Sequence, residues 1–161
     1  MPPRARHRID VLLVPELLER EPDRAAFEAI LSGWEASGRV RDGSLIRGGF
    51  RRVWLDVPGH VALYANQQGG YYVRCPVSQG NVARAFSSAV QAWRAGGERR
   101  MRCPECGQEH PLEAVVLAPP GAFARGAVVF SDVGSLDMGP SVQQELLGVL
   151  GESRLIVRRT G

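Results

Sequence analysis

The spacing of hydrophobic positions changes several times along the chain, and each spacing predicts a different element. Residues 9–14 form a short apolar run rich in branched side chains, which predicts a buried strand. Pro22 and Asp23 then open a segment of helical periodicity that Gly38 is placed to end. The apolar side chains of this predicted helix recur on one face, and they are Phe27, Ile30, Leu31 and Trp34.

From residue 44 onward the period becomes two, as in a half-buried strand. Three segments rich in aromatic or branched residues, 50–56, 60–66 and 71–75, are separated by turns that contain glycine. This pattern predicts an antiparallel meander in which neighbouring segments pair with each other. Cys75 then lies at the end of a strand.

A second helix is predicted between Asn81, which can cap its start, and the pair Gly96-Gly97, which can end it. The polar side of this helix carries arginines that stay in water. Its apolar stripe is expected to pack on the sheet, and it consists of Val82, Phe86, Val90 and Trp93.

The C-terminal part of the chain predicts further strands and one more helix. Segments 112–117, 122–130 and 155–157 have the composition of strands. Ser141, with Gln144 three residues later, forms a capping box and predicts a helix before the last strand.

Together these elements predict a single α+β domain over residues 1–161. We expect a mostly antiparallel sheet, three helices and a zinc-ribbon-like pair of turns inserted at residues 75–110. The order of the strands does not follow from these patterns.

Composition narrows the class of protein but not its activity. The 161 residues are 44% hydrophobic and 23% charged, which is typical of a soluble globular protein. The net charge is only +3, and every cationic side chain is an arginine. Basic residues concentrate in segment 81–102, where five arginines accompany one acid, Glu98. Such a patch can contact nucleic acid or an acidic protein, although a solvated helix face is the simpler interpretation.

The cellular location is expected to be cytoplasmic. No segment approaches the roughly 20 apolar residues of a membrane helix, and the run 9–14 is stopped by Pro15 before it reaches signal-peptide length. Three cysteines, two of them in one Cys-x-x-Cys turn, indicate metal binding in a reducing compartment rather than a disulfide framework.

The cysteines are the clearest chemical signal. Cys103 and Cys106 belong to the sequence Cys-Pro-Glu-Cys-Gly, whose spacing aims two thiolates at one point. Cys75 begins a similar turn, but Ser78 stands where a second cysteine is expected. His110 is the best candidate for a fourth zinc ligand. A water molecule at an open position is one alternative, and a degenerate site that keeps the fold without metal is another.

Signals for catalysis are poor, and we expect no enzyme. The sequence lacks a Gly-rich phosphate loop, a His-Glu-x-x-His motif and a Gly-x-Ser-x-Gly motif. Three thiolates and a water would resemble a catalytic zinc site, but such a site needs a nearby carboxylate. Glu105 and Glu109 lie in the turn itself, where we expect them to be exposed.

The stretch from Cys75 to the C-terminus resembles a group of small bacterial zinc-ribbon proteins. In that pattern a Cys-Pro-x-Cys turn is followed by a helix ending in Ala-Trp-x-x-Gly-Gly, a Cys-Pro-x-Cys-Gly turn, and Pro-Leu-Glu. The resemblance implies a structural ribbon built into an α+β domain, and it supplies no reaction. The residues that carry it are Cys75-Pro76, Ala92-Trp93, Gly96-Gly97, Cys103 to Gly107, Pro111 to Glu113, and the closing segment 130–157.

Two functional hypotheses follow. The first is a protein-binding module, most concretely an immunity-type inhibitor that occludes the active site of a cognate toxin, because small bacterial proteins of this size are frequent partners of toxins. The second is a nucleic-acid-binding zinc ribbon that uses the arginine-rich segment, including Arg102. The candidate partner-binding residues are Arg84, Arg94, Arg99, Arg100, Asp132 and Asp137.

Overall fold

The computed structural model describes residues 8–160, and the chain divides into two compact units. One unit contains the residues up to Gly69 together with those from Ala122 onward, and the other is Gly70–Gly121. The class is α+β with mostly antiparallel pairing, as the sequence predicts. In this part of the chain no helix has the length and apolar character needed to cross a bilayer.

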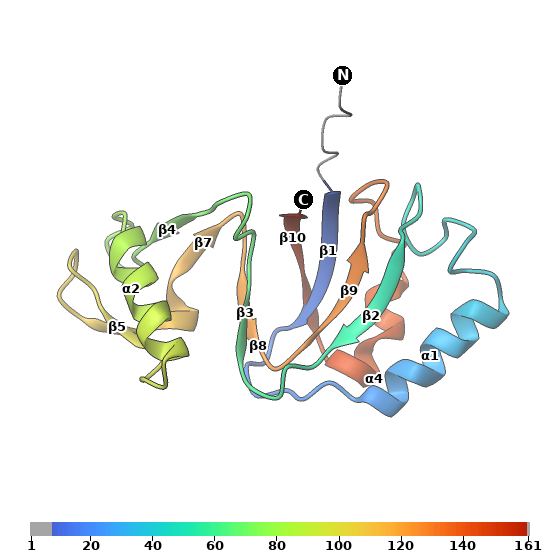
Figure 1. Ribbon diagram of the computed structural model, residues 1–161, viewed down its shortest axis with the longest axis horizontal. Helices are drawn as coiled ribbons and strands as arrows, with labels where there is room; N and C mark the ends of the chain where they lie inside the picture. The colour runs from blue at the N-terminus through green and yellow to red at the C-terminus, as the bar shows by residue number, and fades with distance from the viewer. Residues whose placement is uncertain (1–7, 161) are drawn as a thin grey trace, which may run out of the picture. The chain divides into compact units, whose positions relative to one another are not determined.

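The first unit is built on a four-stranded antiparallel sheet of order β10-β1-β9-β2 (Figure 1). The predicted first strand is confirmed as β1, whose eight residues all pair with β10. Because β1 also pairs with β9, it lies inside the sheet. Both faces of β1 are also buried, which explains its continuous apolar run. The bounds are β1 Arg8–Pro15, β2 Arg52–Asp56, β9 Ala127–Ser131 and β10 Ser153–Thr160.

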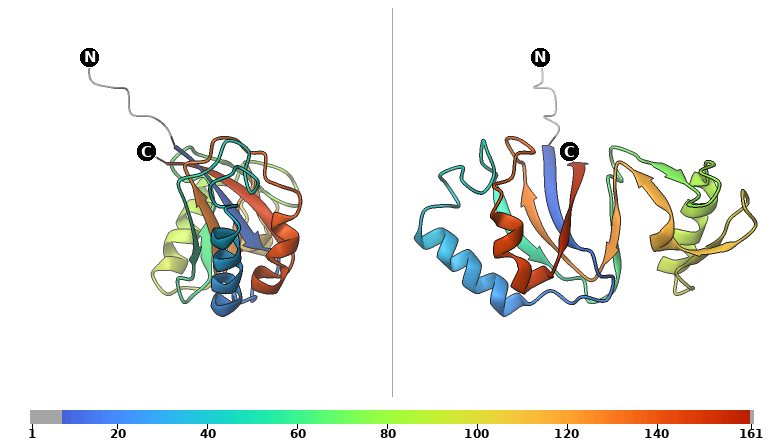
Figure 2. Two further views of the ribbon diagram at one scale, coloured as in Figure 1. Left: turned by 90° about the vertical axis from the view of Figure 1, so that its right-hand side faces the viewer. Right: turned by 180° about the vertical axis from the view of Figure 1, so that it is seen from behind.

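The predicted first helix is confirmed as α1, Arg24–Ala36. Asp23 caps it, because its Oδ1 accepts a hydrogen bond of 3.0 Å from the N–H of Ala26. Phe27 and Trp34 are buried in a core that also contains Leu13 of β1 and residues of α4 (Leu147–Leu150). Figure 2 shows α1 and α4 on the same side of the sheet.

The prediction for the last helix is wrong in two details. It forms as two short helices, α3 (Val142–Glu145) and α4, with Leu146 between them. Ser141 does not form a capping box, since its φ and ψ of −86° and −13° are helical and its side chain caps no backbone N–H. The hydroxyl of Ser141 donates instead to Oε2 of Glu145 at 3.1 Å.

The predicted meander is also wrong. β2 pairs with β9, β3 (Ala62–Tyr64) with β8 (Ala122–Ala124), and β4 (Tyr72–Arg74) with β7 (Val116–Ala118). These pairs are nested in the sequence, so each outgoing strand meets a strand of the returning chain rather than its neighbour. The connections between β2, β3 and β4 are also longer than the two-residue turns typical of tight hairpins.

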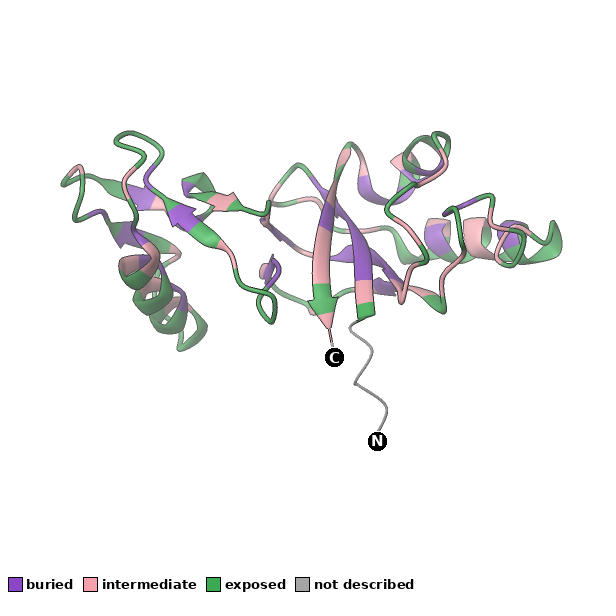
Figure 3. Ribbon diagram, turned by 90° about the horizontal axis from the view of Figure 1, so that it is seen from above, coloured by how far each residue is buried: buried purple, intermediate pink, exposed green. Residues whose placement is uncertain are grey.

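The second face of the four-stranded sheet is covered by β3 and β8. Leu12, Val129 and Ile156 of the sheet pack there against Tyr64 and Ala124. Figure 3 shows how burial concentrates along the strands of this unit.

The second unit surrounds the predicted second helix, which forms as α2, Ala83–Arg94. Val82, Phe86 and Val90 of its apolar stripe are buried, as predicted. Asn81 precedes the capping position, yet its Oδ1 accepts a hydrogen bond of 2.9 Å from the N–H of Ala83. The remaining elements are β4, β5 (Arg100–Arg102), β6 (Glu109–Pro111), a 3₁₀ turn at Leu112–Ala114, and β7.

Segment 112–117 is therefore not one continuous strand, as was predicted. Its first three residues form the 3₁₀ turn, and β7 begins only at Val116. Leu112 is completely buried in this turn, which accounts for the apolar character that suggested a strand.

Candidate metal centre

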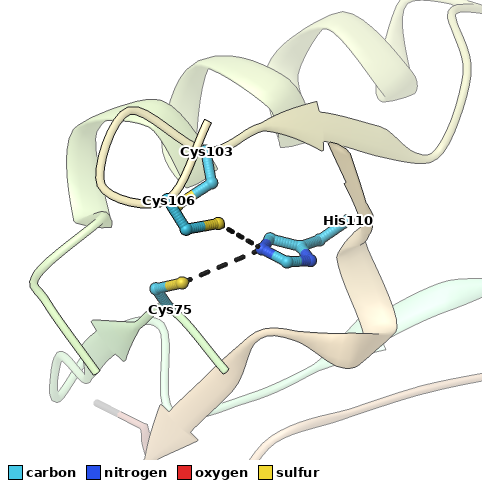
Figure 4. A group of neighbouring side chains, drawn as sticks. All are labelled: Cys75, Cys103, Cys106 and His110. Carbon is cyan, nitrogen blue, oxygen red and sulfur yellow. Dashed lines mark hydrogen bonds between the residues drawn. The ribbon is translucent and has the colours of Figure 1, made fainter. Parts of the chain in front are cut away.

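Four side chains that the sequence marks as possible ligands lie together in the second unit (Figure 4). The sulfur atoms of Cys75, Cys103 and Cys106 and a ring nitrogen of His110 all lie within 4.8 Å of one another. Cys75 and Cys103 are fully buried, His110 is 7% exposed, and Cys106 is half-buried. The predicted grouping of these residues as a possible metal site is confirmed.

The distances in the cluster are close to those of a tetrahedral metal site. Nε2 of His110 lies 3.1 Å from Sγ of Cys106 and 3.8 Å from Sγ of Cys75. Sulfur and nitrogen ligands of one tetrahedral zinc ion are separated from each other by about 3.5–3.8 Å. Shifts of the side chains by about 1 Å or less would bring all four to bonding distance.

Two turns of the same backbone design deliver the cysteines. We call residues 75–80 the first knuckle and residues 103–108 the second knuckle. In the first, Cys75 donates its N–H to the carbonyl of Gly80 at 2.9 Å and accepts at its own carbonyl from Gln79 at 2.9 Å. In the second, Cys103 makes the corresponding bonds with Gln108, at 2.8 Å, and with Gly107, at 2.9 Å.

The correspondence includes the backbone angle that each turn requires. Gln79 has φ of 61°, and Gly107, at the matching position, has φ of 74°. The left-handed conformation suits glycine, so the first knuckle keeps the shape of the second although a less suitable residue occupies this position. The first knuckle is therefore degenerate in its ligands but not in its backbone.

An arginine precedes the cysteine in both knuckles and plays the same structural part. Arg74 donates to the carbonyl of Gln79 at 3.3 Å, and Arg102 donates to the carbonyl of Gly107 at 3.5 Å. Sequence reasoning missed this role. The signal for it is the repeated sequence Arg-Cys-Pro at residues 74–76 and 102–104.

His110 is the candidate ligand that takes the place of the second cysteine missing from the first knuckle. It lies on β6 opposite Met101 of β5, in the hairpin that the second knuckle closes. Val82 takes the corresponding place after the first knuckle, where its N–H donates to the carbonyl of Val73 at 3.0 Å. Three of the four candidate ligands thus come from the β5–β6 hairpin, and Cys75 alone comes from the first knuckle.

Hydrogen bonds to Cys75 favour its thiolate form. The hydroxyl of Ser78, then the N–H groups of Ser78 and Val77, act on this sulfur, and they lower its pKa to about 5 against the effect of burial. Both N–H groups lie 3.4 Å from Sγ. Ser78, the residue in the place of the missing cysteine, is therefore a donor to the neighbouring ligand.

The pKa of the neighbouring Cys106 thiol shifts in the opposite direction, upward. The N–H of Gln108 lowers the pKa of Cys106, but burial and the hydrogen bonds with Cys103 and Cys75 outweigh it and leave this pKa above its ordinary value. Neighbouring thiolates repel one another, so a further thiol in the cluster gives up its proton less easily unless a cation is bound there. A divalent metal ion supplies that positive charge and holds coordinating cysteines as thiolates.

The two carboxylates nearest the second knuckle in sequence are not members of the cluster. Glu105 and Glu109 are exposed, as the sequence suggests. The Glu109 carboxylate lies 3.8 Å from the guanidinium of Arg100.

The candidate partner-binding residues are distributed over both units. Arg84 and Arg94 are exposed on α2. Arg99 forms an ion pair of 3.1 Å with Glu113, and Arg100 contacts Glu109, so both already have acidic neighbours. Their assignment to a partner surface stays a prediction.

The two candidate aspartates belong to the other unit. The N–H of Asp132 donates to Oδ1 of Asp10 at 3.1 Å, and Asp132 has φ of 48°. Asp137 is exposed, and its N–H donates to Oγ of Ser135 at 3.2 Å. These contacts give both residues a structural part in their loop, and a role in partner binding stays a prediction.

Comparisons of this chain with protein-family models, with curated proteins and with solved structures found no match.

Proposed function

We propose that residues 70–121 bind one zinc ion through Cys75, Cys103, Cys106 and His110, and that this ion has a structural role. The observation that carries the proposal is the convergence of three sulfur atoms and one imidazole nitrogen within 4.8 Å in a largely buried cluster. Three thiolates and one imidazole form one of the usual donor sets of structural zinc.

The donor set supports a structural rather than a catalytic ion. Four protein ligands fill a tetrahedral site, whereas a catalytic zinc keeps a position for water or substrate. The ion would join Cys75 to the β5–β6 hairpin, and so fix the segment that leads into α2. Its contribution is to the folding free energy of this unit.

We further propose that the protein acts by binding another protein, in the specific form of an immunity-type inhibitor that occludes the active site of a toxin. The second unit supports a binding role, because it exposes apolar side chains beside cationic ones. Tyr72 is 71% exposed, Val77 61% and Val116 49%. Arg74 pairs in register with Val116 across β4 and β7, and it is also exposed. Tyrosine and arginine are enriched among the residues that dominate protein interfaces.

Metal analysis tests the first part of the proposal. The purified protein is expected to contain one zinc per chain, and the Cys75→Ala and His110→Ala variants to contain much less. Loss of folding along with zinc supports a structural ion. If a variant stayed folded and lost an enzymatic activity of the wild type, the structural role would be wrong.

Partner isolation tests the second part. Affinity-tagged protein recovered from its native host should carry one partner in a fixed ratio, and adding the purified protein should inhibit that partner's activity. A chain that elutes alone under these conditions contradicts the binding proposal. A bound partner whose activity is unchanged contradicts the inhibitor form while leaving binding intact.

A further inference from the structure

The outer edge of β10, in the first unit, is partly open. Among the strands of residues 8–160, β10 is the last of its sheet and pairs with β1 alone. Near one end, the N–H of Arg159 points away from β1 and donates to Oδ1 of Asn66 at 2.7 Å. At the other end, the carbonyl of Ser153 accepts from Nε2 of Gln143 at 2.9 Å. Since backbone groups of an antiparallel strand alternate with a period of two, Leu155 and Val157 between them also direct their N–H and C=O groups outward.

These two residues leave four main-chain groups available for pairing. Within residues 8–160, no hydrogen-bond partner is found for the outward groups of Leu155 and Val157. Gln143, which covers Ser153, is an exposed side chain that can move aside. An edge of this kind accepts an additional strand through main-chain hydrogen bonds.

We propose that β10 binds an extended, acidic segment of a partner protein as an added strand. The side chains beside the open positions are cationic. Arg154 and Arg158 lie four residues apart on one face of β10, with the buried Ile156 between them. Arg154 is exposed, whereas Arg158 donates through Nε to Asp10 at 3.3 Å and keeps further N–H donors on its guanidinium.

A hollow beside the end of the strand is suited to a carboxylate. It has a volume of about 270 Å³ and is lined by Leu63, Ala65, Gln67, Gln68 and the last three residues of β10. Arg158 and Arg159 are among these three, so the lining includes two arginines and two glutamines. Guanidinium groups form strong, directional hydrogen bonds with carboxylates.

A second copy of this chain fits the edge less well than an acidic partner. If two copies of β10 paired antiparallel through Leu155 and Val157, Arg154 of one copy would lie opposite Arg158 of the other. Like charges directly opposite each other destabilise strand pairing. Carboxylates placed four residues apart in the added strand would instead meet both arginines.

This inference rests on the proposed binding function but not on the metal centre, because β10 belongs to the other unit. Its test uses the full chain, as purified, labelled with ¹⁵N. The probe is the acetylated and amidated peptide Ser-Glu-Val-Thr-Val-Glu-Ser, whose two carboxylates match the spacing of Arg154 and Arg158. The control peptide has lysine in place of both glutamates.

The measurement is the hydrogen-exchange rate of the N–H groups of Leu155 and Val157. At a peptide concentration of about ten times Kd, binding is expected to slow both rates by about tenfold. The lysine peptide is expected to leave them unchanged. Slow exchange of both groups in the free protein, equal protection by the two peptides, or no protection by either would each overturn the proposal.

Two variants locate the binding edge. Val157→Pro removes an outward N–H at a position where an edge strand tolerates proline, and it should abolish protection of Leu155 while the β1 amides stay protected. Arg154→Glu leaves one acidic and one cationic side chain at these positions, so it should remove the preference for the acidic peptide, which keeps the test decisive if the proline variant fails to fold. Protection that rises with protein concentration without peptide would identify a second copy as the occupant and overturn the acidic partner. If a native partner still bound Val157→Pro fully, the binding function would stand and the assignment to β10 would fall.

Discussion

Ser78 and Cys106 occupy the same position in two knuckles of the same backbone design, yet only Cys106 offers a thiol to the candidate metal site. His110 lies 3.1 Å from Cys106 and brings the fourth donor from a strand instead of from the first knuckle. A cysteine at position 78 is therefore expected to be able to act as a ligand in place of His110. This expectation can be tested directly.

We expect Ser78→Cys to restore zinc binding to a chain that lacks His110. The His110→Ala variant should lose most of its zinc, whereas His110→Ala/Ser78→Cys should recover it through four thiolates. Cobalt substitution distinguishes the two sites, because the absorption bands of a four-sulfur site differ from those of three sulfurs and one nitrogen. A double variant that stays free of metal would show that residue 78 cannot reach the ion.

Chelation of the metal is expected to loosen the second unit selectively. Because the four ligands all belong to residues 70–121, an excess of chelator should speed hydrogen exchange in α2 and β5 while leaving β1 protected. His60→Ala, which changes an exposed histidine of the other unit, is the matched control for His110→Ala. Equal loss of protection in both units would contradict a role confined to the second.

Glu145 should make the first unit sensitive to acid. It accepts from Arg39, from Nε1 of Trp34 at 3.2 Å and from Ser141, so it connects α3 to α1 and the segment that follows it. The hydrogen bond with Arg39 holds the pKa of Glu145 below its ordinary value of 4.5. This contribution is complete at neutral pH and is lost as the pH falls from 4.5 through the lower folded-state pKa.

Glu145→Gln is expected to lower the free energy of unfolding at pH 7 by about 1–2 kcal/mol. The difference from the wild type should shrink as the pH falls from 4.5 through the lower folded-state pKa, because Glu145 then becomes protonated and, like glutamine, uncharged. Urea unfolding followed by tryptophan fluorescence at pH 7 and pH 3.5 measures both effects. Glu28→Gln, at an exposed position of α1, is the control and should change little.

Nucleic-acid binding is expected to be weak. The net charge is +3, and Arg99 and Arg100 already have acidic neighbours, which leaves few arginines to neutralise phosphates. Fluorescence anisotropy with labelled oligonucleotides between about 50 and 200 mM salt measures this. Tight binding whose logarithm falls by roughly 0.7–0.9 per contacted phosphate, and which Arg84→Ala/Arg94→Ala abolishes, would instead support the nucleic-acid hypothesis.

Local patterns were sufficient for the first two helices and the first strand. The capping residue Asp23 and the stripe containing Phe27 and Trp34 act within a few residues of one another, so their spacing alone indicates α1. The pairing of the strands was not predictable in the same way. β2, β3 and β4 have suitable composition, but each pairs with a segment from much later in the chain, and only the packed core determines that choice.

The candidate ligands were predictable because cysteine spacing carries a strong chemical signal. Cys103 and Cys106 define a turn without reference to the rest of the fold, and His110 is close to them in sequence. The role of Ser78 as a hydrogen-bond donor to Cys75 was not predictable from the residue type. It appears only when its hydroxyl and N–H are seen to act on the sulfur of Cys75.

The first knuckle keeps its shape through hydrogen bonds of its own main chain, from Cys75 to Gly80 and from Gln79 to Cys75. These main-chain hydrogen bonds therefore do not depend on the side chain at position 78. Related chains are therefore expected to retain both turns while differing in whether a cysteine at position 78 or a histidine on the neighbouring strand completes the candidate site.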